Sequence, residues 1–137
     1  MIVRIWRGHT RSEDAESYTE FIEKTGLADY RATPGNLGAA ILRGAAPQAG
    51  DARRPPGPQG RADTAEFLVL SFWKDFDAIR RFAGPDPEKA HYYPEDDRYL
   101  LGKEPHVTHY ELASRVGPLW EIAEERATVR FAAEGDE

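Results

Sequence analysis

Residues 73–109 bring together side chains that could bind and transform a small molecule. Aromatic rings in this stretch are interspersed with groups that titrate or carry charge: Trp73, Phe82, His91, Tyr92, Tyr93, Asp96, Asp97, Arg98, Tyr99 and His109. Aromatic walls with a few convergent polar groups are typical of small-molecule pockets. In the alternative interpretation the rings only fill the gap between a helix and a sheet, and we expect this packing role for Trp73, Phe82 and Tyr93.

His91 has the widest chemical range in this cluster. Imidazole exchanges protons near neutral pH, so His91 is a candidate general base or acid, or a ligand of haem iron. A histidine on a short helix is also common as a surface or capping residue, and this interpretation stays open. Asp96 and Asp97 are expected to begin a helical turn and to pair with Arg98.

The sequence argues against a metal centre. The chain has four histidines and no cysteine, which excludes disulfides, thiolate nucleophiles, zinc–thiolate sites and iron–sulfur clusters. His106 and His109 lie three residues apart in an expected strand, so they point to opposite faces and cannot bind one ion together. Glycine-rich nucleotide loops, Walker lysines, nucleophile elbows and HExxH motifs do not occur in the sequence.

Length and charge narrow the class of protein. A chain of 137 residues has the size of one domain, and 40% hydrophobic with 31% charged residues indicates a globular one. The net charge of −6 argues against a nucleic-acid partner. No apolar run approaches the roughly 18 residues of a membrane span, and the N-terminus lacks the apolar core of a signal peptide. The expected location is therefore the cytoplasm.

The first half of the chain predicts a strand, a helix and a second strand. Residues 2–7 are rich in β-branched and aromatic side chains. Thr10 with Glu13 has the spacing of a capping box, and apolar residues at helical spacing then predict a helix over 11–25. Gly26 stands where a terminating glycine belongs. A turn over 31–36 leads to a strand over 37–43.

The second half predicts a strand, a helix and a last strand. Residues 66–73 form the strongest strand signal, and Asp75 is the expected N-cap of a helix over 76–83 that Gly84 ends. A short helix is expected from Pro87 to Tyr93, then a further turn after Pro94, then a strand over 106–112. The order β-α-β-β-α-β is that of a ferredoxin-like α+β sandwich with an antiparallel sheet.

Two segments fall outside this pattern. Residues 44–65 contain eight Gly or Pro among 22 residues, with Ala as the only apolar side chain, which predicts a flexible loop inserted at a hairpin tip. We interpret it as a tolerated insertion, with a gate or partner-binding arm as the alternative. Residues 114–137 form a tail that is expected to be helical from Pro118. The domain itself is expected to span 1–113.

The strand over 66–73 also predicts an assembly. Phe67, Leu68, Val69 and Leu70 are apolar without alternation, which is typical of a strand covered on both faces. Helices on one side of a four-stranded sheet leave the second face open, and a second copy of the chain would cover it in a symmetric homodimer. The tail helix is a competing cover, and we expect it to be an accessory to the dimer.

Three segments resemble the antibiotic biosynthesis monooxygenase domain family: FLVLSFWKDFDAIRRFAG, EKAHYYPEDDRYLL and PHVTHYEL. IWRGHT and ATPGNLGAAILR are similar to the early part of the same pattern, so the resemblance covers about residues 1–113. It implies a dimeric α+β barrel. Some members are cofactor-independent oxygenases that deprotonate a quinol-like substrate, whose anion then reduces oxygen. Trp73 matches the tryptophan that ends the family's third strand, and Arg80 or Arg81 lies near the position of an arginine that members use.

Another branch of the family degrades haem. It uses an asparagine on the first strand, a tryptophan in the second helix and a histidine in an Ala-His pair. Ala90 and His91 match the last element, which would place His91 on the iron. The other two do not carry over, because the first strand has Trp6, Arg7 and Gly8 and the second-helix position lies near Phe82.

Three hypotheses follow. The leading one is a cofactor-independent, metal-free monooxygenase acting on a small phenolic or quinol-type molecule, with His91 as acid or base and His109 as the reserve base. In it, Tyr92 and Arg98 orient the substrate, and Trp73, Phe82 and Tyr93 form its aromatic surroundings. The second is haem binding or degradation through His91. The third is a non-catalytic barrel that binds a small molecule or has a closed core filled by Phe82, Tyr93 and Leu100.

Overall fold

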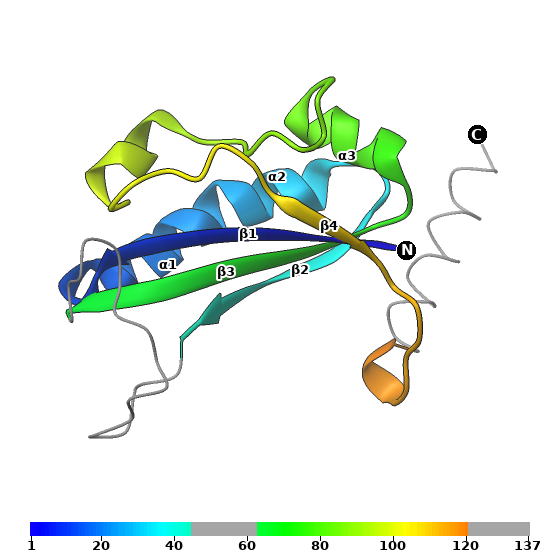
Figure 1. The fold of residues 1–137 in the computed structure, drawn as a ribbon, viewed down its shortest axis with the longest axis horizontal. Helices are drawn as coiled ribbons and strands as arrows, with labels where there is room; N and C mark the ends of the chain where they lie inside the picture. Colours follow the sequence, from blue (N-terminus) through cyan, green and yellow to red (C-terminus); the bar gives the residue numbers. More distant parts are fainter. Residues whose placement is uncertain (45–62, 121–137) are drawn as a thin grey trace.

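The fold is an α+β sandwich built on one antiparallel sheet. The computed structural model describes residues 1–44 and 63–120. The strands pair in the order β2-β3-β1-β4, and helices lie on one face of the sheet (Figure 1). The element order and the ferredoxin-like fold class predicted from the sequence are confirmed. The elements are β1 (Ile2–Arg11), α1 (Ala15–Lys24), α2 (Gly26–Ala32), β2 (Asn36–Arg43), β3 (Thr64–Trp73), α3 (Phe76–Ala83) and β4 (Thr108–Glu111).

Side-chain alternation on β1 decides what this strand contributes to each face. Ile2, Arg4 and Trp6 are buried on the helix side, while Val3 and Ile5 point to the opposite side. β3 pairs antiparallel with β1 along its full length, from Thr64 to Trp73. Both strands are longer than the predicted ranges of 2–7 and 66–73, because this pairing continues to their polar ends.

The first helix differs from its prediction at both ends. Thr10 does not cap it: Thr10 lies in β1, is fully buried, and its hydroxyl donates to the carbonyl oxygen of Arg11 (2.9 Å). A 3-10 turn, η1 (Ser12–Asp14), precedes α1 instead. Gly26 does not end the helical region either. The chain bends at Thr25, whose hydroxyl donates to the Phe21 carbonyl oxygen (2.7 Å), and continues as α2.

α3 agrees with its prediction, and the segment after it does not. Asp75 accepts the N–H of Ala78 (2.9 Å), and Gly84 ends the helix with φ of 95°. The helix predicted from Pro87 to Tyr93 is absent. Lys89 and His106 form an isolated antiparallel bridge, and backbone hydrogen bonds join Ala90 to Pro105 and Val107 to Glu88. This tertiary partner supplies backbone hydrogen bonds in place of those of a helix. β4 spans Thr108–Glu111 and is shorter than the predicted 106–112 at both ends.

The remaining predictions concern the segment after Pro94 and the segments next to residues 45–62 and 121–137, which the structure does not describe. The turn expected after Pro94 is the 3-10 helix η3 (Pro94–Arg98). Most of the predicted 44–65 loop lies outside the described residues, and Thr64 and Ala65 belong to β3. The predicted tail helix begins at Pro118 as expected, and the rest of it lies outside the described residues. No helix within residues 1–44 and 63–120 is long and apolar enough to cross a membrane.

The sheet face opposite the helices is apolar. We name this the outer sheet face, and it consists of Val3, Ile5, Leu68, Leu70 and Phe72, all only partly buried. None of α1, α2 and α3 covers it, although the ring of Trp120 contacts that of Phe72 (5.7 Å between centroids). At the edge strands, Leu42 and Tyr110 are 42% and 53% exposed. We propose, as the sequence predicted, that a second copy of the chain covers this face.

A charged residue introduced on the outer sheet face should therefore dissociate the proposed dimer. We expect the wild type to elute with twice the 15.4 kDa mass of the chain, and Leu70→Glu to elute as a monomer, because a buried unpaired carboxylate opposes association. Size-exclusion chromatography with light scattering measures both. Ala28→Glu, an equivalent change on the exposed side of α2, should leave the dimer intact. A monomeric wild type would contradict the proposal.

Candidate functional site

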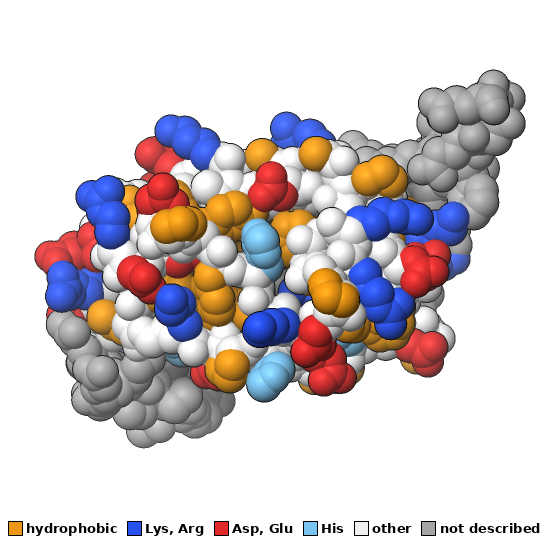
Figure 2. All heavy atoms as spheres, turned by 90° about the horizontal axis from the view of Figure 1, so that it is seen from above, with side chains coloured by type: hydrophobic (Ala, Val, Ile, Leu, Met, Phe, Trp, Pro, Cys, Tyr) orange, Lys and Arg blue, Asp and Glu red, His pale blue; other side chains and the backbone are white. Residues whose placement is uncertain are grey.

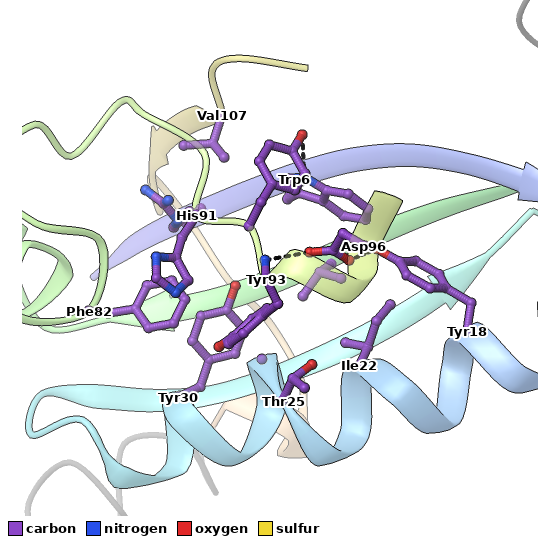
Figure 3. A pocket seen from close by; sticks show the side chains of 14 residues that line it. Trp6, Tyr18, Ile22, Thr25, Tyr30, Phe82, His91, Tyr93, Asp96 and Val107 are labelled. Atoms are coloured by element: carbon purple, nitrogen blue, oxygen red, sulfur yellow. Dashed lines mark hydrogen bonds between the residues drawn. The ribbon is translucent and has the colours of Figure 1, made fainter. Parts of the chain in front are cut away.

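A pocket lies between β1, the two first helices and the segment after α3. Its empty volume is about 480 Å³, including the part open to solvent. Figure 2 shows the face above it, where hydrophobic side chains gather near the centre among charged ones. Rings dominate the wall of the pocket (Figure 3): Trp6, Tyr18, Tyr30, Phe82, His91, Tyr92 and Tyr93.

Arg4 is the buried cation of this wall. Its position in β1 points it inward between Ile2 and Trp6, and the residue is only 2% exposed. Its Nη1 donates to the Pro87 carbonyl oxygen, and its Nη2 donates to the Lys89 carbonyl oxygen (3.0 Å). No carboxylate among the described residues pairs with it. Burial lowers the pKa of Arg4, but a guanidinium stays charged in proteins.

Buried polar groups continue from Arg4 into the core. Tyr30 on α2 lies near both Arg4 and Ser71, which partly offset the effect of burial on its pKa, and the Ser71 hydroxyl accepts the indole N–H of Trp73 (2.8 Å). Burial raises the pKa of Tyr30, so its hydroxyl is neutral. Trp73 is 0% exposed and lies behind these buried polar groups. Trp73 therefore supports Tyr30, their rings meeting edge to face at 5.7 Å, and does not line the pocket.

His91 lies on the pocket wall and is exposed to solvent. Its ring packs against those of Phe82 and Tyr93, at centroid distances of 5.0 and 5.1 Å, and Figure 3 shows the three together. It makes no hydrogen bond to any residue of the described ranges. Both ring nitrogens therefore remain available to a ligand.

Tyr92 connects β1 to the backbone near Glu104. Its hydroxyl accepts the indole N–H of Trp6 (3.1 Å) and donates to the Glu104 carbonyl oxygen (2.6 Å). Burial raises the pKa of Tyr92. With its hydroxyl engaged on both sides, Tyr92 offers a bound molecule mainly its ring. Gly8 makes room for this arrangement, since a Cβ there would lie 2.4 Å from the Trp6 indole.

Asp96 holds the other end of the pocket together. The carboxylate is 4% exposed, and it accepts the Tyr18 hydroxyl (2.8 Å) and the Tyr93 backbone N–H (2.7 Å) (Figure 3). The Tyr93 hydroxyl donates to Asp29. Burial raises the pKa of both tyrosines, and in each case the carboxylate that accepts its hydroxyl raises it further. Asp96 thus fixes η3 in place.

The pairing predicted between the two aspartates and Arg98 is therefore wrong. Asp96 binds Tyr18 and Tyr93, and Asp97 forms an ion pair with Lys103 (2.7 Å). Arg98 is exposed, lies outside the pocket wall, and packs over the Tyr99 ring. The structure gives Arg98 no contact through which it would orient a molecule in this pocket.

His109 lies next to Arg4, behind the pocket wall. Its Nε2 is 3.1 Å from Arg4 Nη1, and since the guanidinium can only donate, the imidazole accepts. Burial, and then the charge of Arg4, lower the pKa of His109 to about 4. His109 is therefore neutral at neutral pH with one nitrogen occupied, which makes it a poor reserve base.

Among the predicted site residues, the structure places His91, Phe82, Tyr92 and Tyr93 around the pocket. Trp73, Arg98 and His109 lie off its wall. Phe82 and Tyr93 line the pocket, and the closed core of the third hypothesis stays a prediction.

Sequence reasoning missed most of the wall, including Arg4, Trp6, Tyr18 and Tyr30. One signal could have revealed Arg4, which stands in phase with Ile2 and Trp6 on the apolar side of a strand. A charged residue on the buried face of a strand is rare unless it is paired, so its position indicates a specific role. Within the part of the chain that the structure describes, no group of three or more His, Asp or Glu side chains is placed to hold a metal ion.

The low pKa of His109 should make stability depend on pH. The folded pKa of about 4 lies below the ordinary value of 6.5, so the unfolded chain binds more protons between these values. The free energy of unfolding should therefore fall as pH falls through this window. His109→Gln keeps an acceptor for Arg4 and removes the titration. Urea denaturation should show that the variant loses less stability than the wild type from pH 7 to 4.5, by on the order of 1 kcal/mol after solvent screening.

The matched control is His106→Gln, which changes an exposed histidine away from Arg4. It should lose as much stability as the wild type over the same range. Equal pH dependence of the wild type and His109→Gln would show that His109 does not carry the effect.

Comparisons with known proteins identify the fold of this chain. No protein-family model and no curated protein matches the sequence. A solved structure of HapK from Hahella chejuensis is similar over 86% of this chain and 99% of HapK, at 16% identity and a TM-score of 0.52. A MhuD mutant with two manganese protoporphyrin IX molecules bound per active site is similar over 86% of this chain and 100% of that one, at 17% identity and a TM-score of 0.49. The likeness to HapK shows the fold of this chain, a small α+β sandwich with a four-stranded antiparallel sheet.

Proposed function

We propose that this chain binds a small aromatic molecule in the ring-lined pocket and oxidises it with O₂ without a cofactor. The observation that carries the proposal is the pocket itself, in which an exposed, unbonded imidazole lies among aromatic rings. The substrate class is phenolic or quinol-type, as the family resemblance implies. Rings of this kind pack against Phe82 and Tyr93 and present a hydroxyl to His91.

His91 is the proposed base. Removing the proton of a phenolic hydroxyl makes the ring electron-rich enough to reduce oxygen. In the overall reaction a ring CH₂ of the keto tautomer becomes C=O, the second oxygen atom leaves as water, and the substrate supplies all four electrons. The protein then needs to bind the substrate between aromatic rings and to hold His91 beside its hydroxyl.

A second candidate is haem binding, and one observation favours it. His91 has a free ring nitrogen on the wall of a pocket of aromatic rings, and an imidazole of this kind would serve as a ligand of haem iron. The surrounding rings of Phe82 and Tyr93 would pack against the macrocycle. Bound haem would supply oxygen chemistry at the iron, and the part of this chain would be to hold and orient it through His91.

The oxygenase proposal predicts a specific loss on changing His91. We expect the wild type to accelerate oxygen uptake by anthrone, whose enol form is a phenol, and His91→Ala to lower kcat by about 100-fold or more. An oxygen electrode measures the rate, and the products are quantified by chromatography. The control is His106→Ala, which alters an exposed histidine outside the pocket. Unchanged turnover in His91→Ala would remove His91 as the base.

The haem candidate predicts a spectrum. Titrating the wild type with hemin at neutral pH should give a saturable 1:1 Soret shift, because an imidazole ligand changes the iron's electronic state. His91→Ala should abolish the shift, and His106→Ala should retain it. A flat titration of the wild type would reject haem binding and would leave the oxygenase proposal in place.

A further inference from the structure

We propose that Arg4 and Tyr30 form an anion-binding end of the pocket, so that the aromatic molecule it accepts carries an acidic oxygen, as a phenolate or a carboxylate. This inference rests on the proposed function, since it names the chemistry of the molecule that the ring-lined pocket holds. It adds a polar end to a site whose other walls are rings.

The first argument is the charge balance around Arg4. Burying a cation is costly unless an anion or several dipoles compensate it. The groups around Arg4 are all neutral: its hydrogen-bond partners are the Pro87 and Lys89 carbonyl oxygens and the His109 imidazole, and the Tyr30 hydroxyl lies near it. The positive charge is thus solvated by dipoles and is not cancelled. An anionic oxygen that enters the pocket would neutralise this charge.

The second argument is that the neighbours of Arg4 keep this charge in place. Tyr30 holds its proton because burial raises its pKa, so it supplies no phenolate to neutralise Arg4. His109 stays neutral because its pKa is lowered to about 4, so it adds no second cation. The site therefore presents a single positive charge with a hydroxyl beside it.

The third argument is the placement of the other charged groups around the pocket. Asp96 is the carboxylate on the pocket wall, and its oxygens already accept from Tyr18 and Tyr93. Asp29 accepts from the Tyr93 hydroxyl. Neither carboxylate is an ion-pair partner of Arg4. The pocket thus has a satisfied acidic end at η3 and an unneutralised basic end at β1.

The rings fix how such a molecule would lie. The Arg4 guanidinium stands 5.9 Å from the centre of the Phe82 ring, and Phe82 in turn packs against Tyr30 (4.5 Å) and His91 (5.0 Å). Figure 3 shows Tyr30, Phe82 and His91 on one side of the pocket. An aromatic molecule packed against Phe82 would have its anionic oxygen near Arg4 and a separate hydroxyl on its other edge near His91.

A purely structural role for Arg4 makes a different prediction. Arg4 also ties the segment at 87–89 to β1, so its loss would loosen the pocket for every ligand alike. An anion-binding role changes the preference between charged and neutral ligands of the same shape. The ratio of two dissociation constants separates these roles, and the absolute affinity does not.

The test uses 2-naphthoate and its neutral isostere 2-naphthamide, with titration calorimetry on the full chain. The wild type should bind naphthoate about tenfold or more tightly than the amide, as expected for charge-assisted hydrogen bonds. Arg4→Met should bring this ratio to about one. Arg7→Met, an exposed arginine on the opposite side of β1, should keep the wild-type ratio. Arg4→Lys should recover part of the preference.

A second variant covers the case in which Arg4→Met does not fold. Tyr30→Phe removes one hydroxyl and keeps the ring, and it should lower the ratio several-fold while the amide binds as in the wild type. To separate the two kinds of acidic oxygen, 2-naphthol is added at neutral pH. Appearance of the naphtholate absorbance on binding would assign the site to phenolates, and its absence with naphthoate preferred would assign it to carboxylates.

The outcomes separate the two proposals. Equal affinity of the wild type for naphthoate and naphthamide would overturn the anion-binding end and leave the aromatic pocket standing. A ratio that survives in both Arg4→Met and Tyr30→Phe would also overturn it. Failure of both ligands to bind the wild type at millimolar concentration would reject the pocket as an aromatic site, and the anion-binding end with it.

Discussion

The guanidinium of Arg4 connects the parts of the molecule that form the pocket. It extends from β1 to the backbone of residues 87–89 and to His109 on β4, so one side chain joins the sheet to the segment after α3. That segment leads directly into His91 and Tyr92. A buried charge with carbonyl oxygens around it is an expensive way to anchor a segment. Its cost is easier to understand if the charge also faces a ligand.

Four tyrosines contribute to the remaining wall, and three of them engage their hydroxyls with other groups of the protein. Tyr18 donates to Asp96, Tyr93 to Asp29, and Tyr92 to the Glu104 carbonyl oxygen. Burial raises the pKa of all three, so each stays neutral and presents a ring to the pocket. These three tyrosines therefore offer a ligand mainly their rings, although their side chains are polar. Arg4, Tyr30 and His91 also line the pocket and carry the polar groups on which the two proposals depend.

The fold by itself does not choose among functions. A four-stranded sheet with helices on one face serves many unrelated chemistries, and the choice depends on the residues placed in the pocket. Here the sequence resemblance and the pocket suggest an aromatic molecule, and the free imidazole of His91 suits either proton transfer or iron ligation. What distinguishes this chain is Arg4 on the first strand, at the end of the pocket away from η3.

The sequence alone determined the order of the elements, α3 with its Asp75 cap and Gly84 end, and four of the pocket residues. These depend on local periodicity and capping chemistry, which neighbouring residues specify. Only the tertiary structure decided that Gly26 begins a helix, that residues 88–90 pair with 105–107, and that Asp96 binds Tyr18 and not Arg98. Each of these depends on a partner distant in the sequence. The role of Arg4 is of the same kind, because its neutral neighbours come from residues 30, 87, 89 and 109, and no local pattern brings these together.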